Sequence, residues 1–194
     1  MSISAFELLK IGIGPSSSHT VGPMKAANAF LKLLQRNNFF KDNKISRVKA
    51  ELFGSLALTG KGHGTDKAIL LGLEGHEPRT VPIQSLIERF KNISTTNKLN
   101  LNGQLQIDFP MRENLLFHKK KILPYHTNGM KFTAFDGIGE KLLSMNYYSI
   151  GGGFFLSQED IDMKSTKTEK KLPFPYSTGK EMILQCENNN MTLA

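Results

Sequence analysis

Hydroxyl groups and a histidine gather in one glycine-bounded segment near the start of the chain. Its five polar side chains are Ser16, Ser17, Ser18, His19 and Thr20, and a helical pattern begins directly after them. Backbone N–H groups at the start of a helix attract carboxylates and phosphates, and hydroxyl and imidazole groups add donors. The segment therefore predicts binding of a small anionic molecule. The alternative is a polar loop in which one serine caps the helix.

A second segment, 54–66, repeats this arrangement around His63. This histidine lies between two glycines, and Lys61 and Thr65 lie within two residues of it. Flanking glycines let the backbone approach a ligand closely. We expect Thr65 and Asp66 to cap a helix here, and that helix terminus would disfavour the protonated imidazole and keep it available as a base. The competing interpretation is an exposed loop histidine.

Two further segments carry polar groups at strand ends. His126 and Asn128 lie in a turn just before a strand, and Ser149 lies near the end of another strand that runs into three glycines. Such glycines indicate either a flexible connection or a backbone brought close to a ligand. Each segment by itself is an ordinary turn. No role is assigned to His76 or His118.

The elements that must position these groups change in character along the chain. The first half has helical spacing and the second half alternates with period two. Expected helices begin at Pro23, occupy 68–73 and run from Pro82 to about Lys91; expected strands are 47–53, 104–109, 130–135 and 142–150, with a turn at 136–139. This order favours an α+β fold, with helices packed on one face of a mainly antiparallel sheet.

Composition limits the classes of function. The chain has 194 residues, a formal charge of +8 and one cysteine, so it cannot by itself supply several thiolates to a metal or a disulfide framework. Lysines gather at 119–121 and 164–171 without interleaved aromatic residues, so a nucleic-acid-binding domain is the weakest of the alternatives. The chain has neither an apolar run of roughly 20 residues nor a secretory signal pattern, which predicts a cytoplasmic protein without a membrane partner.

The last part of the chain has a separate composition. A lysine-rich stretch leads into Pro173-Phe174-Pro175, a semi-rigid linker, and a helix is expected from Ser177 or Thr178 through Leu184. Thr192 resembles the cap of a further helix. We therefore expect one domain over 1–163, and over 164–194 a linker and the start of a missing C-terminal domain.

Taken together, the four polar segments resemble the beta domain of the bacterial iron-sulfur L-serine dehydratases. The resemblance extends from about Gly14 to the linker near Phe174. It rests on four stretches in the same order as in the family: Ser16–Pro23, Gly54–Asp66, His126–Met130 and Tyr147–Gly153. The beta domain also resembles the allosteric substrate-binding domain of some D-3-phosphoglycerate dehydrogenases, which agrees with the α+β expectation.

The resemblance implies elimination of water from L-serine, followed by conversion of aminoacrylate to pyruvate and ammonia, without pyridoxal phosphate. It also implies a four-iron, four-sulfur cluster with one iron free of cysteine, bound by an alpha domain on the same or a separate chain. This chain holds no cluster ligand set and is expected to be inactive alone. A homodimer is the expected assembly.

For the site, the resemblance assigns acid or base work to His63 and His126. It assigns substrate contacts to a larger set: Ser16, Ser17, Ser18, His19, Thr20, Lys61, Thr65, Asn128 and Ser149. The alternative function is a regulatory serine-binding module without chemistry, which would use the same loops with the histidines as hydrogen-bond donors.

Overall fold

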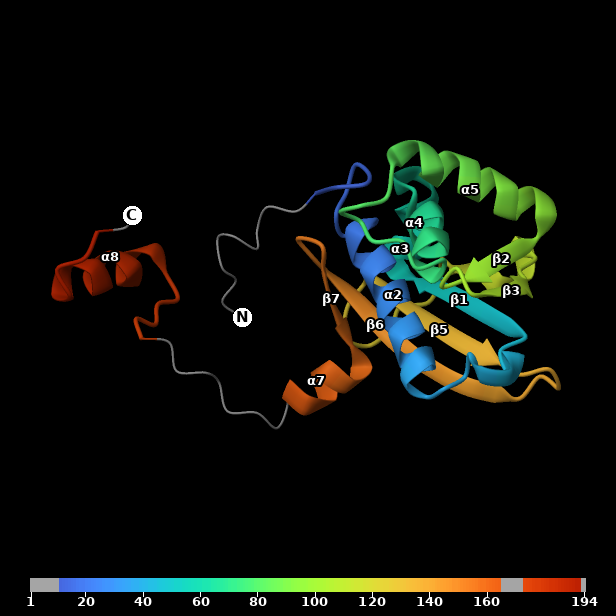
Figure 1. Ribbon diagram of the computed structural model, residues 1–194. Coiled ribbons are helices and arrows are strands. Elements are labelled where there is room, and N and C mark those ends of the chain that lie inside the picture. The colour runs from blue at the N-terminus through green and yellow to red at the C-terminus, as the bar shows by residue number, and fades with distance from the viewer. Residues whose placement is uncertain (1–10, 165–172, 193–194) are drawn as a thin grey trace. The chain divides into compact units, whose positions relative to one another are not determined.

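The computed structural model describes residues 11–164 and 173–192. The chain divides into two compact units, Met1–Ile161 and Asp162–Ala194 (Figure 1). The first unit contains all the predicted site residues, and the second is described separately below.

A five-stranded sheet with the order β4-β1-β5-β6-β7 forms the centre of the first unit. Its strands are β1 (Arg47–Phe53), β4 (Leu115–His118), β5 (Gly129–Phe135), β6 (Lys141–Gly151) and β7 (Phe154–Ser157). Only β1 and β4 run parallel within this sheet, and its other neighbours are antiparallel. β2 (Lys98–Leu101) and β3 (Leu105–Asp108) form a separate antiparallel pair, which comes before β4 in the sequence.

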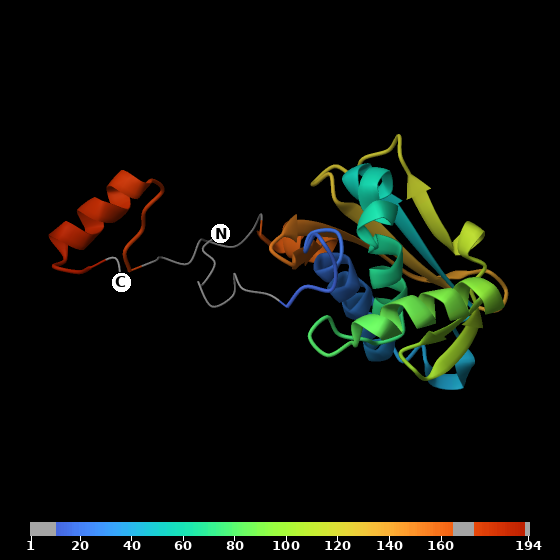
Figure 2. The same ribbon diagram turned by 90° about the horizontal axis from the view of Figure 1, so that it is seen from above.

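Helices cover the sheet as a second layer. The main ones are α2 (Val21–Arg36), α3 (Gly54–His63), α4 (Thr65–Leu73) and α5 (Ile83–Thr96); shorter ones are the 3-10 turn η1 (Lys41–Asn43), α6 (Met111–Asn114) and α7 (Gln158–Lys164). Seen from above, α2, α4 and α5 lie to one side of the strands (Figure 2). The α+β prediction, with a mainly antiparallel sheet, is confirmed. The likeness to the phosphoglycerate dehydrogenase domain stays a prediction.

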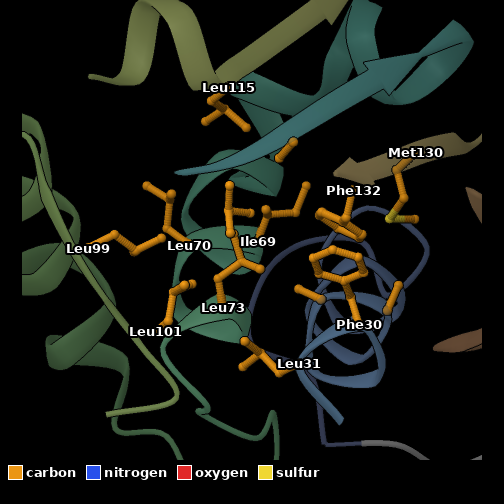
Figure 3. Packing of buried hydrophobic residues seen from close by; sticks show 14 of the residues in the cluster. Phe30, Leu31, Ile69, Leu70, Leu73, Leu99, Leu101, Leu115, Met130 and Phe132 are labelled. Atoms are coloured by element: carbon orange, nitrogen blue, oxygen red, sulfur yellow. The ribbon is translucent and has the colours of Figure 1, made fainter. Parts of the chain in front are cut away.

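Alternation along β1 decides which face of the sheet is buried. Val48, Ala50 and Leu52 are fully buried, whereas Arg47 is exposed. Phe30 of α2 packs near Phe132 of β5, with ring centroids 5.5 Å apart, and leucines of α2, α4 and β2 fill the rest of the core (Figure 3). Burying one such side chain contributes roughly 1.5–3 kcal/mol to folding.

The structure corrects the expected local structure of 54–66. This segment contains four glycines and its pattern predicts a helix only after Thr65 and Asp66, but 54–63 is helix α3, with His63 as its last residue. The predicted cap is also wrong: Gly64 precedes α4, and Thr65 and Asp66 are the first residues of that helix. The reason is packing, because Leu56 and Ala57 are buried in the core and this burial outweighs the low helix propensity of glycine.

Smaller differences concern boundaries and missed strands. α2 begins at Val21, so Pro23 is its third residue and not its first. Three short strands, β2, β4 and β7, were not predicted, because a strand of 4 residues offers too little alternation to recognise. The turn at 136–139 does join β5 to β6 as expected, with Asp136 N–H donating to the Glu140 carbonyl.

In the second unit, α8 (Gly179–Asn188) begins as the sequence predicts. The Thr178 hydroxyl accepts from the Glu181 N–H at 3.2 Å, and a Glu181 carboxylate oxygen accepts from the Ser177 N–H at 2.6 Å. Most of the basic run 164–171 lies outside the described residues. Among the helices that are described, none combines the length and apolar character needed to cross a bilayer.

Candidate functional site

Helix α3 presents three polar side chains on one face. Ser55, Thr59 and His63 are spaced four residues apart, which places them one above another along the helix. Each takes part in the hydrogen bonds of the site described below. The face is directed toward the 16–20 loop, since the His63 and His19 ring centroids lie 4.7 Å apart.

The 16–20 loop is held in shape by its own backbone. The Ser16 carbonyl accepts from the His19 N–H and from the Thr20 hydroxyl, and the Ser17 carbonyl accepts from the Gly22 N–H at the start of α2. A methyl group on Gly22 would lie 2.1 Å from the Ser149 Oγ atom. Glycine is therefore required for α2 to start so close to the end of β6.

His19 lies at the centre of a chain of hydroxyl groups. Its Nδ1 is 2.9 Å from Ser18 Oγ, and its Nε2 is 3.0 Å from Thr59 Oγ1 and 3.2 Å from Ser55 Oγ. The Thr59 hydroxyl donates its only proton to the Ser55 carbonyl, so it accepts from His19 Nε2–H. The Nδ1 atom of neutral His19 is then free to accept from Ser18.

The electrostatic surroundings of His19 agree with a neutral ring. Burial lowers its pKa below 6.5, and the neighbouring His63 lowers the pKa further whenever that second ring is protonated. The residue is 9% exposed, so a protonated ring would lose much of its hydration. His19 therefore serves in this network as a neutral hydrogen-bonding group.

His63 has its proton placed by the backbone of its own helix. Its Nδ1 lies 2.9 Å from the Thr59 carbonyl, which can only accept, so neutral His63 carries its proton on Nδ1. The Nε2 lone pair is then left available. This half-buried histidine at the end of α3 has the arrangement of a general base.

His126 has the opposite arrangement. Its Nδ1 accepts from the Asn128 N–H at 3.0 Å, so neutral His126 carries its proton on Nε2. The turn around it is joined to α3, because the Thr127 carbonyl accepts from the Ser55 N–H at 3.0 Å. The same turn that holds His126 therefore also contacts the start of the helix that ends at His63.

Asn128 and Ser149 connect this turn to the 16–20 loop. The Asn128 side chain donates to the Ser149 carbonyl at 3.2 Å, and the Ser149 hydroxyl donates to the Ser18 carbonyl at 2.7 Å. The Asn128 side-chain oxygen is buried and receives no hydrogen bond from the described part of the chain. Four segments that are distant in sequence thus form one network.

Three of the residues predicted to contact the substrate use their hydroxyl groups to hold the 16–20 loop in place. Thr20, Thr65 and Ser149 are almost fully buried, and each donates to a backbone carbonyl: those of Ser16, His19 and Ser18, respectively. A role for these three in contacting substrate stays a prediction. Ser16 and Ser18 lie beside His19, whereas no hydrogen bond of the Ser17 hydroxyl occurs within 11–164.

Lys61 lies away from the hydroxyl groups around His19. It is two residues from Thr59 on α3, and its ammonium group lies 5.1 Å from the centre of the Phe117 ring of β4. Sequence reasoning missed Ser55 and Thr59. Their spacing of four from His63 would have revealed them, had the segment been recognised as a helix.

The donor groups of the chain do not fit an iron-sulfur cluster. The sequence has one cysteine, Cys186, which lies in the second unit, and a cluster of four irons needs several thiolates. No group of three or more His, Cys, Asp or Glu side chains suited to a metal occurs among residues 11–164 and 173–192.

Comparison with known proteins places this arrangement in context. Residues 4–160 match the family model described as serine dehydratase beta chain. The chain is 42% identical over 195 residues to an L-serine dehydratase of Streptomyces coelicolor, and 42% identical over 193 residues to L-serine dehydratase 2 of Escherichia coli. An L-serine dehydratase of Helicobacter pylori is 37% identical over 198 residues. These matches cover 99–100% of this chain but 41–42% of each relative.

Proposed function

Because the chain belongs to the serine dehydratase beta chain family, we propose that it supplies the substrate-binding and acid/base groups of an L-serine dehydratase. The chain spans about two fifths of the length of the curated relatives it matches, so the activity is proposed for the complete protein. The reaction is α,β-elimination of water from L-serine, which gives pyruvate and ammonia.

Proton removal from the α carbon is assigned to His63. The observation that carries the proposal is the 2.9 Å contact of its Nδ1 with the Thr59 carbonyl, which leaves the Nε2 lone pair available. A base must present a lone pair within hydrogen-bond reach of the proton it removes. The neutral ring of His19 beside it avoids a second positive charge when His63 becomes protonated.

A hydrogen-bond donor role is assigned to His126, whose neutral ring keeps its Nε2 proton. Its Nε2–H is the free donor of the ring, because Nδ1 accepts from the Asn128 backbone. A donor at this place would assist the departing hydroxide or hold the substrate carboxylate. Ser16, Ser17, Ser18, His19 and Asn128 supply hydrogen bonds to the carboxylate and ammonium groups.

The remaining groups of the enzyme come from outside this sequence in our proposal. A four-iron, four-sulfur cluster would be held by an alpha domain, on the same or another chain, and pyridoxal phosphate would take no part. This chain without that domain would then be inactive. We also propose a homodimer that works in the cytoplasm.

The test separates this function from that of a regulatory serine-binding module. Pyruvate formation from L-serine is measured for the chain with and without an added alpha domain carrying its cluster. Activity that appears only with both parts supports the proposal. Saturable serine binding without pyruvate formation, in a preparation whose cluster absorbance is intact, would favour the regulatory module.

A further inference from the structure

A cavity of about 470 Å³ lies between the α3–α4 junction and helices α5 and α6. Its lining is mostly apolar and includes three charged side chains, those of Lys61, Asp66 and Arg112. None of the histidines or hydroxyl groups of the site described above is in this lining. The volume is within the range of about 300–1,000 Å³ that is usual for small-molecule sites.

Asp66 supplies a carboxylate to this mostly apolar cavity. The residue is 9% exposed, and its Oδ1 accepts from the Lys67 N–H at 2.9 Å. No residue of the described chain donates to Oδ2 or forms an ion pair with this carboxylate. Oδ2 is not among the fully buried, unpartnered polar atoms of the described residues, so it stays accessible as an acceptor, and the nearby charges of Lys67 and Lys61 partly offset the burial of the carboxylate.

Two cations flank the same cavity. Lys61 lies over the Phe117 ring at 5.1 Å, and Arg112 is exposed in α6. Arg112 has no hydrogen-bond or ion-pair partner within the described residues. The cavity therefore offers an acceptor and two cationic donors, together with aromatic and aliphatic walls.

We propose that this cavity binds a free α-amino acid with an apolar side chain. The ammonium group donates to the open oxygen of Asp66, and the carboxylate pairs with Lys61 and Arg112. The side chain packs on the apolar walls. A zwitterion fits better than a simple acid or amine, because only a zwitterion satisfies the carboxylate and the cations together. The inference does not depend on the proposed dehydratase activity.

The cost of keeping Asp66 in this place also supports a binding role. Burial raises the pKa of its carboxyl group above the ordinary value, so its charged form is less stable in the folded protein than in water. Substitution by asparagine removes this cost. A residue whose charge does not serve folding but completes a cavity is a candidate for ligand binding.

The experiment is calorimetric titration of the full chain with three probes of similar shape. L-leucine carries both charges, 4-methylpentanoate lacks the ammonium group, and 3-methylbutylamine lacks the carboxylate. Leucine should bind at least about tenfold more tightly than either of the others, because each lost charged hydrogen bond costs about 1.5–3 kcal/mol. Equal affinity for leucine and 4-methylpentanoate would overturn the proposal, as would absence of leucine binding.

Two variants locate the site. Asp66→Asn should weaken leucine binding at least about tenfold without lowering the melting temperature. Arg112→Ala removes the exposed cation that is proposed to pair with the leucine carboxylate, and should also weaken binding. Asp108→Asn, an exposed carboxylate of β3, is the matched control and should bind leucine normally. Leucine binding that both Asp66→Asn and Arg112→Ala leave unchanged would place the ligand elsewhere and refute the proposal.

Discussion

His63 and His126 lie in two regions that give the same side chain opposite hydrogen-bonding roles. In the last turn of α3, a backbone carbonyl accepts from His63 Nδ1; in the turn before β5, a backbone N–H donates to His126 Nδ1. A carbonyl partner leaves a lone pair on Nε2, and an N–H partner leaves a proton there. The local backbone therefore decides which histidine keeps a lone pair on Nε2 and which keeps a proton there, and the proposed roles of base and donor follow from this difference.

The two regions also differ in how they are held. His63 is fixed within one helix, because its partner Thr59 lies one turn earlier in α3. His126 depends on a contact between distant segments, in which the Thr127 carbonyl accepts from the Ser55 N–H. We therefore expect changes in α3 to affect the base directly, and changes at the contact to displace the donor.

The largest effect is expected from removing the base. His63→Ala should lower kcat of the complete enzyme by at least about 10²-fold, or roughly 2.7 kcal/mol of transition-state stabilisation, since a general base supplies on the order of 10²- to 10⁴-fold. Cluster content and thermal stability should change little. The control is His76→Ala, outside this network. A variant with near-normal kcat and a raised KM would assign His63 to substrate binding and make His126 the candidate base.

A smaller loss is expected at the donor. His126→Ala should lower kcat by about 10- to 10²-fold, because help to the leaving group is lost while proton removal remains possible. The pH profile of kcat should lose its acidic limb in His63→Ala and keep that limb in His126→Ala, because a neutral hydrogen-bond donor is not the base. Loss of the same limb in both variants would contradict the assignment of separate roles.

The contact that holds the His126 region can be broken at Gly54. This residue has φ of +52°, and a methyl group on it would lie 2.3 Å from the Thr127 carbonyl oxygen. Gly54→Ala should lower the free energy of unfolding by about 2–3 kcal/mol, through the left-handed backbone and the clash. Gly62→Ala, in the same helix with nothing within 4 Å, should be neutral or stabilising. Urea unfolding of both variants measures the difference.

The helix that begins at Gly54 differs from its neighbours in how far the sequence predicts it. The alternation of 47–53 and the apolar run 68–73 made β1 and α4 predictable, because in each case the pattern lies within the segment itself. Helix α3 was not predictable in this way, since its three glycines argue against a helix and burial of Leu56 and Ala57 stabilises it. The signal from tertiary packing is absent from the local pattern.

The candidate site, like the fold, could be predicted only in part from the sequence. Their polar, glycine-rich surroundings predict functional roles for His19, His63 and His126, and hydrogen bonds of Asn128 and Ser149 join the turn after His126 to the 16–20 loop. Thr59 was missed, because its role depends on the helix. Which nitrogen carries the proton depends on a backbone partner for His63 and His126 and on the Thr59 hydroxyl for His19, and these partners are visible only in the fold.

Thr59 allows the two histidines to be uncoupled. Its hydroxyl accepts from His19 Nε2–H and its carbonyl accepts from His63 Nδ1–H, so Thr59→Val removes the first contact and keeps the second. We expect a loss of about tenfold in kcat/KM, similar to one or two hydrogen bonds. Thr59→Ser should restore it. Nitrogen NMR of the imidazoles checks the cause: in Thr59→Val the His19 signals should shift while those of His63 stay, and a shift of both would show that the helix itself has moved.

The smallest effect concerns stability, and it follows from the neutral state of His19. Burial and then the charge of His63 lower the pKa of His19 in the folded chain below its ordinary value of 6.5. As the pH falls below 6.5, the unfolded chain takes up a proton that the folded chain does not, so the free energy of unfolding decreases until the pH reaches the lowered pKa. Above 6.5 this contribution is fully present. The slope due to His19 must stay under about 1.4 kcal/mol per pH unit, the value for one whole proton.

Urea unfolding between about pH 5 and 8 should therefore show a shallower decline for His19→Gln than for the unchanged chain, whereas His76→Gln should keep the original decline. An equal slope in all three proteins would mean that His19 titrates alike in both states, and the neutral ring beside His63 would then have to be abandoned.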